Sequence, residues 1–246
     1  MELIRKNIHM EHCLKLASTQ ISLEEDQNIS DQKPDAFQIV CKKSNINITE
    51  TKIQDETILV KGQLLYEVLY LTEEKEKRLC SIEGEIPFEE KIFINQEMPG
   101  EGIRVKTAVE DLMIRLINSR KMNVRCIISM SVMQDKLYDE EMVVDAEEHD
   151  SCEILKKPLD MTTIMLDTKD IYRIKEEITI PDGLPNIYNL LWKNVRVDGL
   201  HFIPMDGKIG IQGEWTAFFL YEGEEEETGF HGQICQQEEN QMVFFQ

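Results

Sequence analysis

One pattern constrains the fold of this chain more than any other, because part of the sequence occurs twice. Residues 34–76 align with residues 185–227 without a gap, at a constant offset of 151. The shared positions are Pro34, Asp35, Asp55, Gly62 and Tyr70 in the first copy and Pro185, Asn186, Asp206, Gly213 and Tyr221 in the second. The sequence therefore predicts two tandem copies of one module.

Apolar and polar side chains alternate with a period of two through most of the sequence, as expected of half-buried β-strands. The clearest stretch places Ile58, Val60, Leu64, Tyr66, Val68 and Tyr70 on one side. We expect further strands at residues 13–23, 45–53, 80–88, 102–112 and 123–133, with a counterpart of the first at 171–180. The fold class is all-β, with two tandem β-sandwich-like modules.

One short helix is expected in each module. Asp35 has the character of an N-cap and is followed three residues later by Gln38, while Pro34 stiffens the entry. In the second copy, Pro185 and Asn186 begin the matching turn.

Gly62 and Gly213 interrupt strong strand patterns in both copies. A glycine inside a strand weakens it unless the backbone requires one, so its recurrence indicates a bulge, a bend or a close backbone approach. Drift at a tolerant position is the alternative.

The modules are expected to cover residues 1–145 and 161–246, joined by a linker at 146–160 that has no sustained periodicity. We expect the second module to be shortened, because the sequence ends at Gln246, soon after Tyr221. The alternative is that the chain is a fragment of a longer protein.

A formal net charge of −20 disfavours binding to nucleic acid, which requires clustered Lys and Arg. No apolar run is long enough to insert into a membrane, and the N-terminus does not read as a secretory signal. We therefore expect a cytoplasmic protein whose six cysteines are reduced.

Few residues suggest chemistry. His9, His12 and Cys13 form the only close His/Cys cluster, which is short of the three or four well-placed ligands that a metal site needs. The acidic run at 222–227 lacks the spacing of a calcium loop. We expect no catalytic residue, no metal site and no cofactor, and hence no enzyme.

Aromatic residues near the C-terminus could line a carbohydrate groove. Trp215, Phe219 and Tyr221 share the core side of their predicted strand, whereas Phe218 lies on the other side. Phe218 is therefore the candidate for an exposed aromatic contact.

Several short motifs are distributed over nearly the whole chain. They are Asn118-Ser119-Arg120-Lys121 with Val109–Leu112 before it, Lys33-Pro34-Asp35, Lys169–Ile178, Leu184–Ile187, Asp206–Glu214 and the opening Met1–Ile8. In this order and spacing they resemble recurrent stretches of the SPOCS-domain proteins of endospore-forming bacteria.

The resemblance implies a spore-coat morphogenetic protein, made in the mother cell and located in its cytoplasm at the forespore surface. It implies an adaptor that binds other coat morphogenetic proteins, with the ATPase of the coat's basement layer as a candidate partner.

The sequence thus favours a structural, protein-binding role. An incomplete second module would leave strand edges open, which another chain or a second copy could cover to form a homo-oligomer. A module that binds glycan such as peptidoglycan is the alternative, and an exposed aromatic row would support it.

Overall fold

The structure is a computed structural model. It describes residues 3–54, 56–73, 79–94, 102–146, 177–224 and 230–244, the last of these as backbone alone, together with single positions between 155 and 175.

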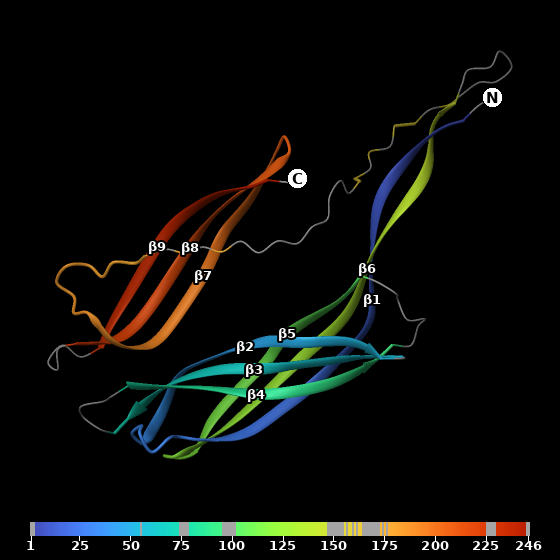
Figure 1. The fold of residues 1–246 in the computed structure, drawn as a ribbon. Helices are drawn as coiled ribbons and strands as arrows, with labels where there is room; N and C mark the ends of the chain where they lie inside the picture. The colour runs from blue at the N-terminus through green and yellow to red at the C-terminus, as the bar shows by residue number, and fades with distance from the viewer. Residues whose placement is uncertain are drawn as a thin grey trace.

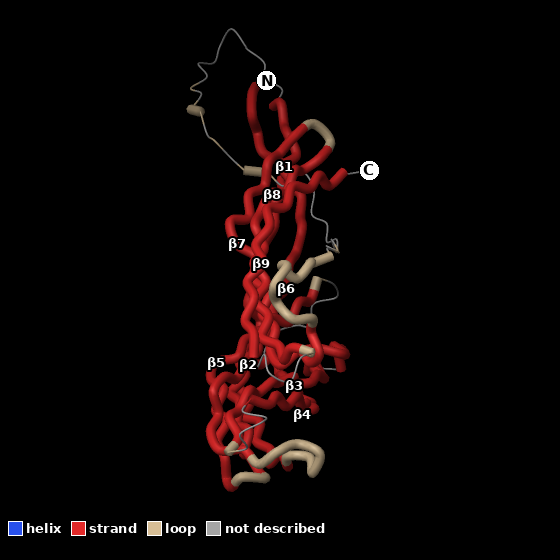
Figure 2. The backbone as a smooth tube through the Cα atoms, turned by 90° about the vertical axis from the view of Figure 1, so that its left-hand side faces the viewer, coloured by secondary structure: helices blue, strands red, loops and turns tan. Residues whose placement is uncertain are grey.

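The described residues form nine strands in three antiparallel sheets (Figure 1). The sheet orders are β1-β6-β5, β2-β3-β4 and β7-β8-β9. Every regular element in the described part of the chain is a strand (Figure 2). The strands are β1 (Leu3–Asn28), β2 (Ala36–Gln54), β3 (Thr57–Thr72), β4 (Leu79–Phe93), β5 (Ile103–Asn118), β6 (Lys121–Ala146), β7 (Ile187–Met205), β8 (Lys208–Gly223) and β9 (Phe230–Phe244).

The first two sheets pack face to face around one hydrophobic core (Figure 1). The core consists mainly of alternate residues of β3 and β6, the central strands of the two layers. The inward positions predicted for β3 are all buried, and they meet Met122, Val124, Cys126, Ile128, Met130 and Val132 of β6. Burial of apolar area on both central strands holds the two layers together.

The predicted helices are wrong, because β2 and β7 occupy those positions and no helix occurs among the described residues. The Ala36 amide donates to the Ser119 carbonyl at 2.8 Å, and β2 then pairs with β3 along its length. Asp35 does not cap a helix, since its carboxylate accepts hydrogen bonds from Ser119 and Arg120. Pairing between distant strands therefore overrides the local capping signal.

The third sheet has the same dimensions as the second. Strands β7, β8 and β9 begin and end at the repeat offset from β2, β3 and β4, respectively. The register of β2 against β3 shifts between Ala36 and Gln38, and that of β7 against β8 shifts between Ile187 and Asn189. The later shifts, at 39/41 and 48/50 in β2, correspond to those at 190/192 and 198/201 in β7.

The strand predicted at 171–180 is not found where it can be assessed. Glu177–Ile180 lie outside any strand, and most of the preceding positions fall outside the described residues. Most of the predicted linker at 146–160 also lies outside them, so the domain limits stay a prediction.

Gly62 lies where neighbouring atoms leave no room for a side chain. A Cβ there would sit 2.6 Å from Cζ of Phe88 and 2.7 Å from the carbonyl oxygen of Asn47. At Gly213 the nearest atom would be Cδ2 of Leu200 at 2.8 Å, and the Asp198 oxygen would be 3.5 Å away. A close approach thus requires glycine in β3, whereas in β8 the neighbour is the end of an exposed, flexible side chain.

We predict that Gly62→Ala lowers the free energy of unfolding by about 1–3 kcal/mol, because a buried ring and a backbone oxygen must move. The matched variant Gly213→Ala should cost less than about 1 kcal/mol, since Leu200 can rotate away. Urea unfolding followed by circular dichroism measures the first effect. Both tryptophans lie in the third sheet, so their fluorescence measures the second. An equal or larger cost for Gly213→Ala would contradict this explanation.

The thiols should differ in reactivity. Cys126 is fully buried in the core and burial raises the pKa of its thiol to about 11, whereas Cys41 on β2 is exposed. Because the thiolate is the nucleophile, iodoacetamide at pH 8 should alkylate Cys41 in the native protein and Cys126 only in urea. Peptide mass spectrometry measures both, and similar native rates at the two positions would argue against this core.

Candidate functional site at the Arg120 turn

The tight turn between β5 and β6 meets the segment that crosses from β1 to β2. The Arg120 amide donates to Oδ1 of Asn118 at 2.9 Å, which fixes the turn locally. The Ile29 amide donates to the Arg120 carbonyl and the Ala36 amide to the Ser119 carbonyl, both at 2.8 Å. The turn therefore binds both ends of the crossover through backbone hydrogen bonds.

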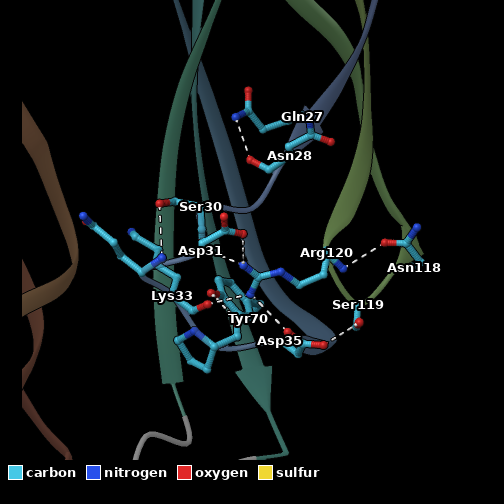
Figure 3. Close-up of polar contacts among 12 residues, drawn as sticks. Gln27, Asn28, Ser30, Asp31, Lys33, Asp35, Tyr70, Asn118, Ser119 and Arg120 are labelled. Carbon is cyan, nitrogen blue, oxygen red and sulfur yellow. Dashed lines mark hydrogen bonds and ion pairs between the residues drawn. The ribbon is translucent and has the colours of Figure 1, made fainter.

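The Arg120 guanidinium lies within this crossover (Figure 3). It donates to the carbonyl oxygens of Lys33 at 2.6 Å and Ser30 at 3.0 Å. It also donates to the carboxylates of Asp31 and Asp35, both at 3.0 Å. These carboxylates, Asp31 foremost, raise the pKa of Arg120. We call this group of contacts the Arg120 latch.

Tyr70 of β3 supports the latch from the core side. Its ring is fully buried, and its hydroxyl donates to the Pro34 carbonyl at 3.1 Å (Figure 3). Burial raises the pKa of this hydroxyl, so it remains a donor throughout the physiological range. In the third sheet, the Tyr221 hydroxyl donates to the Pro185 carbonyl at 3.2 Å, which is the same contact at the repeat offset.

Polar contacts around the latch extend it along the sheets. Asp26 at the end of β1 pairs with Lys121 at 2.8 Å and accepts from Asn123 at 2.9 Å. Asn123 and Lys121 both lower the pKa of Asp26. The Lys33 ammonium donates to the Ser81 carbonyl of β4. The crossover is thus bound to β3, β4 and the β5–β6 turn at once.

The chemistry of the latch is that of a structural junction. Its donors are directed at oxygens of the chain itself, and both carboxylates pair with Arg120. The residues that the structure describes contain no cluster of three or more His, Cys, Asp or Glu that could hold a metal ion. In that part of the chain, His9 instead binds Oδ1 of Asp139 at 2.5 Å, across β1 and β6.

A cavity of about 580 Å³ lies on the outer side of the second sheet. Its charged lining includes Lys43, Glu67 and Glu85 of the second sheet and Lys193 of β7. Lys43 pairs with Glu67 at 2.6 Å, donates to the Lys193 carbonyl and lies 4.4 Å from the Trp192 ring centre. These contacts join the third sheet to the sandwich through its outer face.

The residues predicted from the repeat are only partly brought together. Pro34, Asp35 and Tyr70 belong to the latch, and Pro185, Asn186 and Tyr221 form a smaller group in which Asn186 binds Glu224 at 3.0 Å. Gly62 and Gly213 lie elsewhere on the central strands, Asp206 is exposed in the β7–β8 turn, and Asp55 lies outside the described residues.

Phe218 is half-buried, not freely exposed, and pairs with Asn194 across β7 and β8. Arg120 does not stand out as a site residue in the sequence, although it belongs to the motif Asn118–Lys121. The available signal was a tight polar turn between two alternating strands, but its partners lie more than 80 positions away.

The fold and the latch define a β-sandwich domain closed by a buried tyrosine and an arginine junction. Comparison with known families matches residues 35–117, which span β2 to β5, to the family described as SipL, SPOCS domain. This segment, about a third of the chain, is therefore similar to the SPOCS domain of SipL, a family linked to sporulation. No curated protein and no solved structure matches the chain.

We predict that Arg120→Ala lowers the melting temperature by about 2–8 °C, because it removes the guanidinium donor from two carbonyls and two carboxylates. Arg120→Lys should recover only part of the loss, since an ammonium cannot reproduce the fork of the guanidinium. Arg115→Ala is the matched control, because Arg115 is exposed on β5. Differential scanning calorimetry measures the melting temperature of each variant. Equal melting temperatures for the two alanine variants would contradict the role of the latch.

Proposed function

We propose that this protein is a non-enzymatic structural adaptor in spore-coat morphogenesis, which acts through protein–protein contacts. The observation that carries the proposal is the match of residues 35–117 to the SipL SPOCS domain, a family linked to sporulation. The adaptor role, the coat and the partners go beyond that match and form our hypothesis.

The surface supports a binding role. Strand β7 is an edge strand of its sheet and exposes nine large apolar side chains. They are Ile187, Tyr188, Leu190, Val195, Val197, Leu200, Phe202, Ile203 and Met205. An edge strand with this much exposed apolar surface is a common site of association. The net charge of −20 keeps such a protein soluble and favours protein partners over nucleic acid.

We further propose that the chain contains two copies of one module, at residues 1–145 and 161–246. Equal strand lengths, equivalent register shifts and the repeated tyrosine–proline hydrogen bond all support duplication. In this view the second copy has the layer β7-β8-β9 that corresponds to β2-β3-β4.

The glycan-binding alternative loses its main support. It requires an exposed aromatic row, but Trp215 is 7% exposed and Tyr221 is fully buried. Phe218 is half-buried and lies on the opposite side of β8. Aromatic residues of β8 therefore contribute to packing instead of forming a platform for sugar rings.

The proposed location is the mother-cell cytoplasm at the forespore surface, with coat morphogenetic proteins as partners and the basement-layer ATPase as the first candidate. Among the residues that the structure describes, no helix is long and apolar enough to cross a membrane.

The test is the position of a fluorescent fusion in a sporulating endospore-forming host. We expect a ring around the forespore that becomes diffuse in a strain lacking the basement-layer ATPase. Co-purification with that ATPase from wild-type sporulating cells should accompany the ring. Fluorescence that stays diffuse in the mother cell, with the fusion intact by immunoblot, would refute the proposed role.

A further inference from the structure

The inward side of β7 is open. Residues of β7 that pair with the inward positions of β8 share their face, so Val195 lies beside Ala217, Val197 beside Trp215 and Phe202 beside Ile211. Val195, Val197 and Phe202 are 61%, 49% and 64% exposed. By contrast, Trp215 and Ala217 of the central strand are buried. The uncovered surface is therefore a strip along β7, which we call the β7 strip.

The corresponding strip of the second sheet is covered. Ile39 and Ile46 of β2, at the positions equivalent to Leu190 and Val197, pack against the core. Strand β5 lies over β2 in the opposing layer and provides this cover. The Lys42 ammonium closes the junction by donating to the Leu112 carbonyl of β5 at 2.6 Å.

The inward faces of β2 and β7 carry similar residues, although only the face of β2 is covered. Lys193 is the counterpart of Lys42, and its register with Phe219 places it on the inward face. None of the inward positions of β7 and β8 carries a carboxylate, in a chain with 47 acidic residues. These positions are Leu190, Lys193, Val195, Val197, Phe202 and Pro204 on β7 and Ile209, Ile211, Gly213, Trp215, Ala217, Phe219 and Tyr221 on β8.

We infer that the β7 strip binds an antiparallel β-hairpin supplied by a partner chain, with one strand of the hairpin lying over β7 as β5 lies over β2. The hairpin presents apolar side chains at alternate positions, as β5 does with Val105, Val109, Leu112, Ile114 and Leu116. Lys193 is placed to donate to its backbone, as Lys42 does to β5. This inference deepens the proposed adaptor function and rests on it.

A hairpin fits this strip better than a whole sheet does. The central strand β8 is already buried at Trp215, Ala217 and Tyr221, so the open surface is too narrow for three strands. A hairpin also satisfies many of its own backbone hydrogen bonds before it docks. Sheet-on-sheet packing of two copies would bring together two chains that each carry −20, which like-charge repulsion opposes.

The experiment uses the purified full chain and a labelled synthetic peptide with the sequence of residues 103–134, in which Cys126 is replaced by Ser. That peptide is this chain's own β5–β6 hairpin and serves as the probe. Fluorescence anisotropy should show saturable binding to the wild-type protein. Val197→Asp and Phe202→Asp should each weaken binding at least about tenfold, because they place a charge in the apolar contact.

The matched control is Ile203→Asp. Ile203 pairs with Gly210 on the opposite face of the same strand and is also exposed, at 43%. Its binding should stay within about twofold of wild type. A peptide with Leu112→Asp should bind weakly, and Lys193→Ala should weaken binding of the intact peptide. Thermal melts confirm that each protein variant is folded, as expected for substitutions of exposed side chains.

Absence of saturable binding, or binding that Val197→Asp and Phe202→Asp leave unchanged, would overturn the inference. Light scattering that shows a dimer broken by Phe202→Asp would also overturn it, in favour of a second copy as the occupant. The binding assay contains no spore component. If the peptide does not bind, the adaptor proposal can still be supported by a fluorescent ring around the forespore. If the ring is missing, the result for peptide binding is unaffected.

Discussion

The burial of β3 against β6 is the interaction on which the rest of the structure depends. Each is the central strand of its layer, and their inward side chains are fully or almost fully buried. The flanking strands then only need to extend a layer whose face is already covered. Because β4 and β5 separate the two central strands in sequence, the core can form only when the intervening chain returns across both layers.

An earlier crossing between the layers, from β1 to β2, creates the need for the Arg120 latch. The crossover from β1 to β2 moves from one layer to the other, and its carbonyls would otherwise lose their hydrogen-bond partners at the edge of the core. Arg120 offers several donors in a fixed planar arrangement, which suits a site where backbone oxygens and carboxylates converge. Tyr70 connects this junction to the core, so the loop and the packing reinforce each other.

The third sheet shows what the same strand pattern does with less cover. The tyrosine–proline contact and the register shifts are retained, and the centre of β8 is buried. Along β7, however, apolar residues that correspond to core-packed residues of β2 are exposed. The difference lies in the cover, because β5 lies over β2, whereas β7 contacts β4 and still keeps these side chains exposed. A scaffold that leaves such a face open is well suited to association.

The sequence by itself determined the faces of the strands that alternate most clearly, such as β3, β6 and β8, because alternation of side chains is a local property and burial follows it. It also indicated the repeat, through equal spacing of Gly62 and Gly213 and of Tyr70 and Tyr221. Only the tertiary structure decided that Asp35 binds Ser119 and Arg120 instead of capping a helix. The same holds for the lengths of β1 and β6, which pair far beyond the predicted limits, and for the exposure of β7. These features depend on which distant strand lies alongside, and that is a property of the folded chain and not of any local segment.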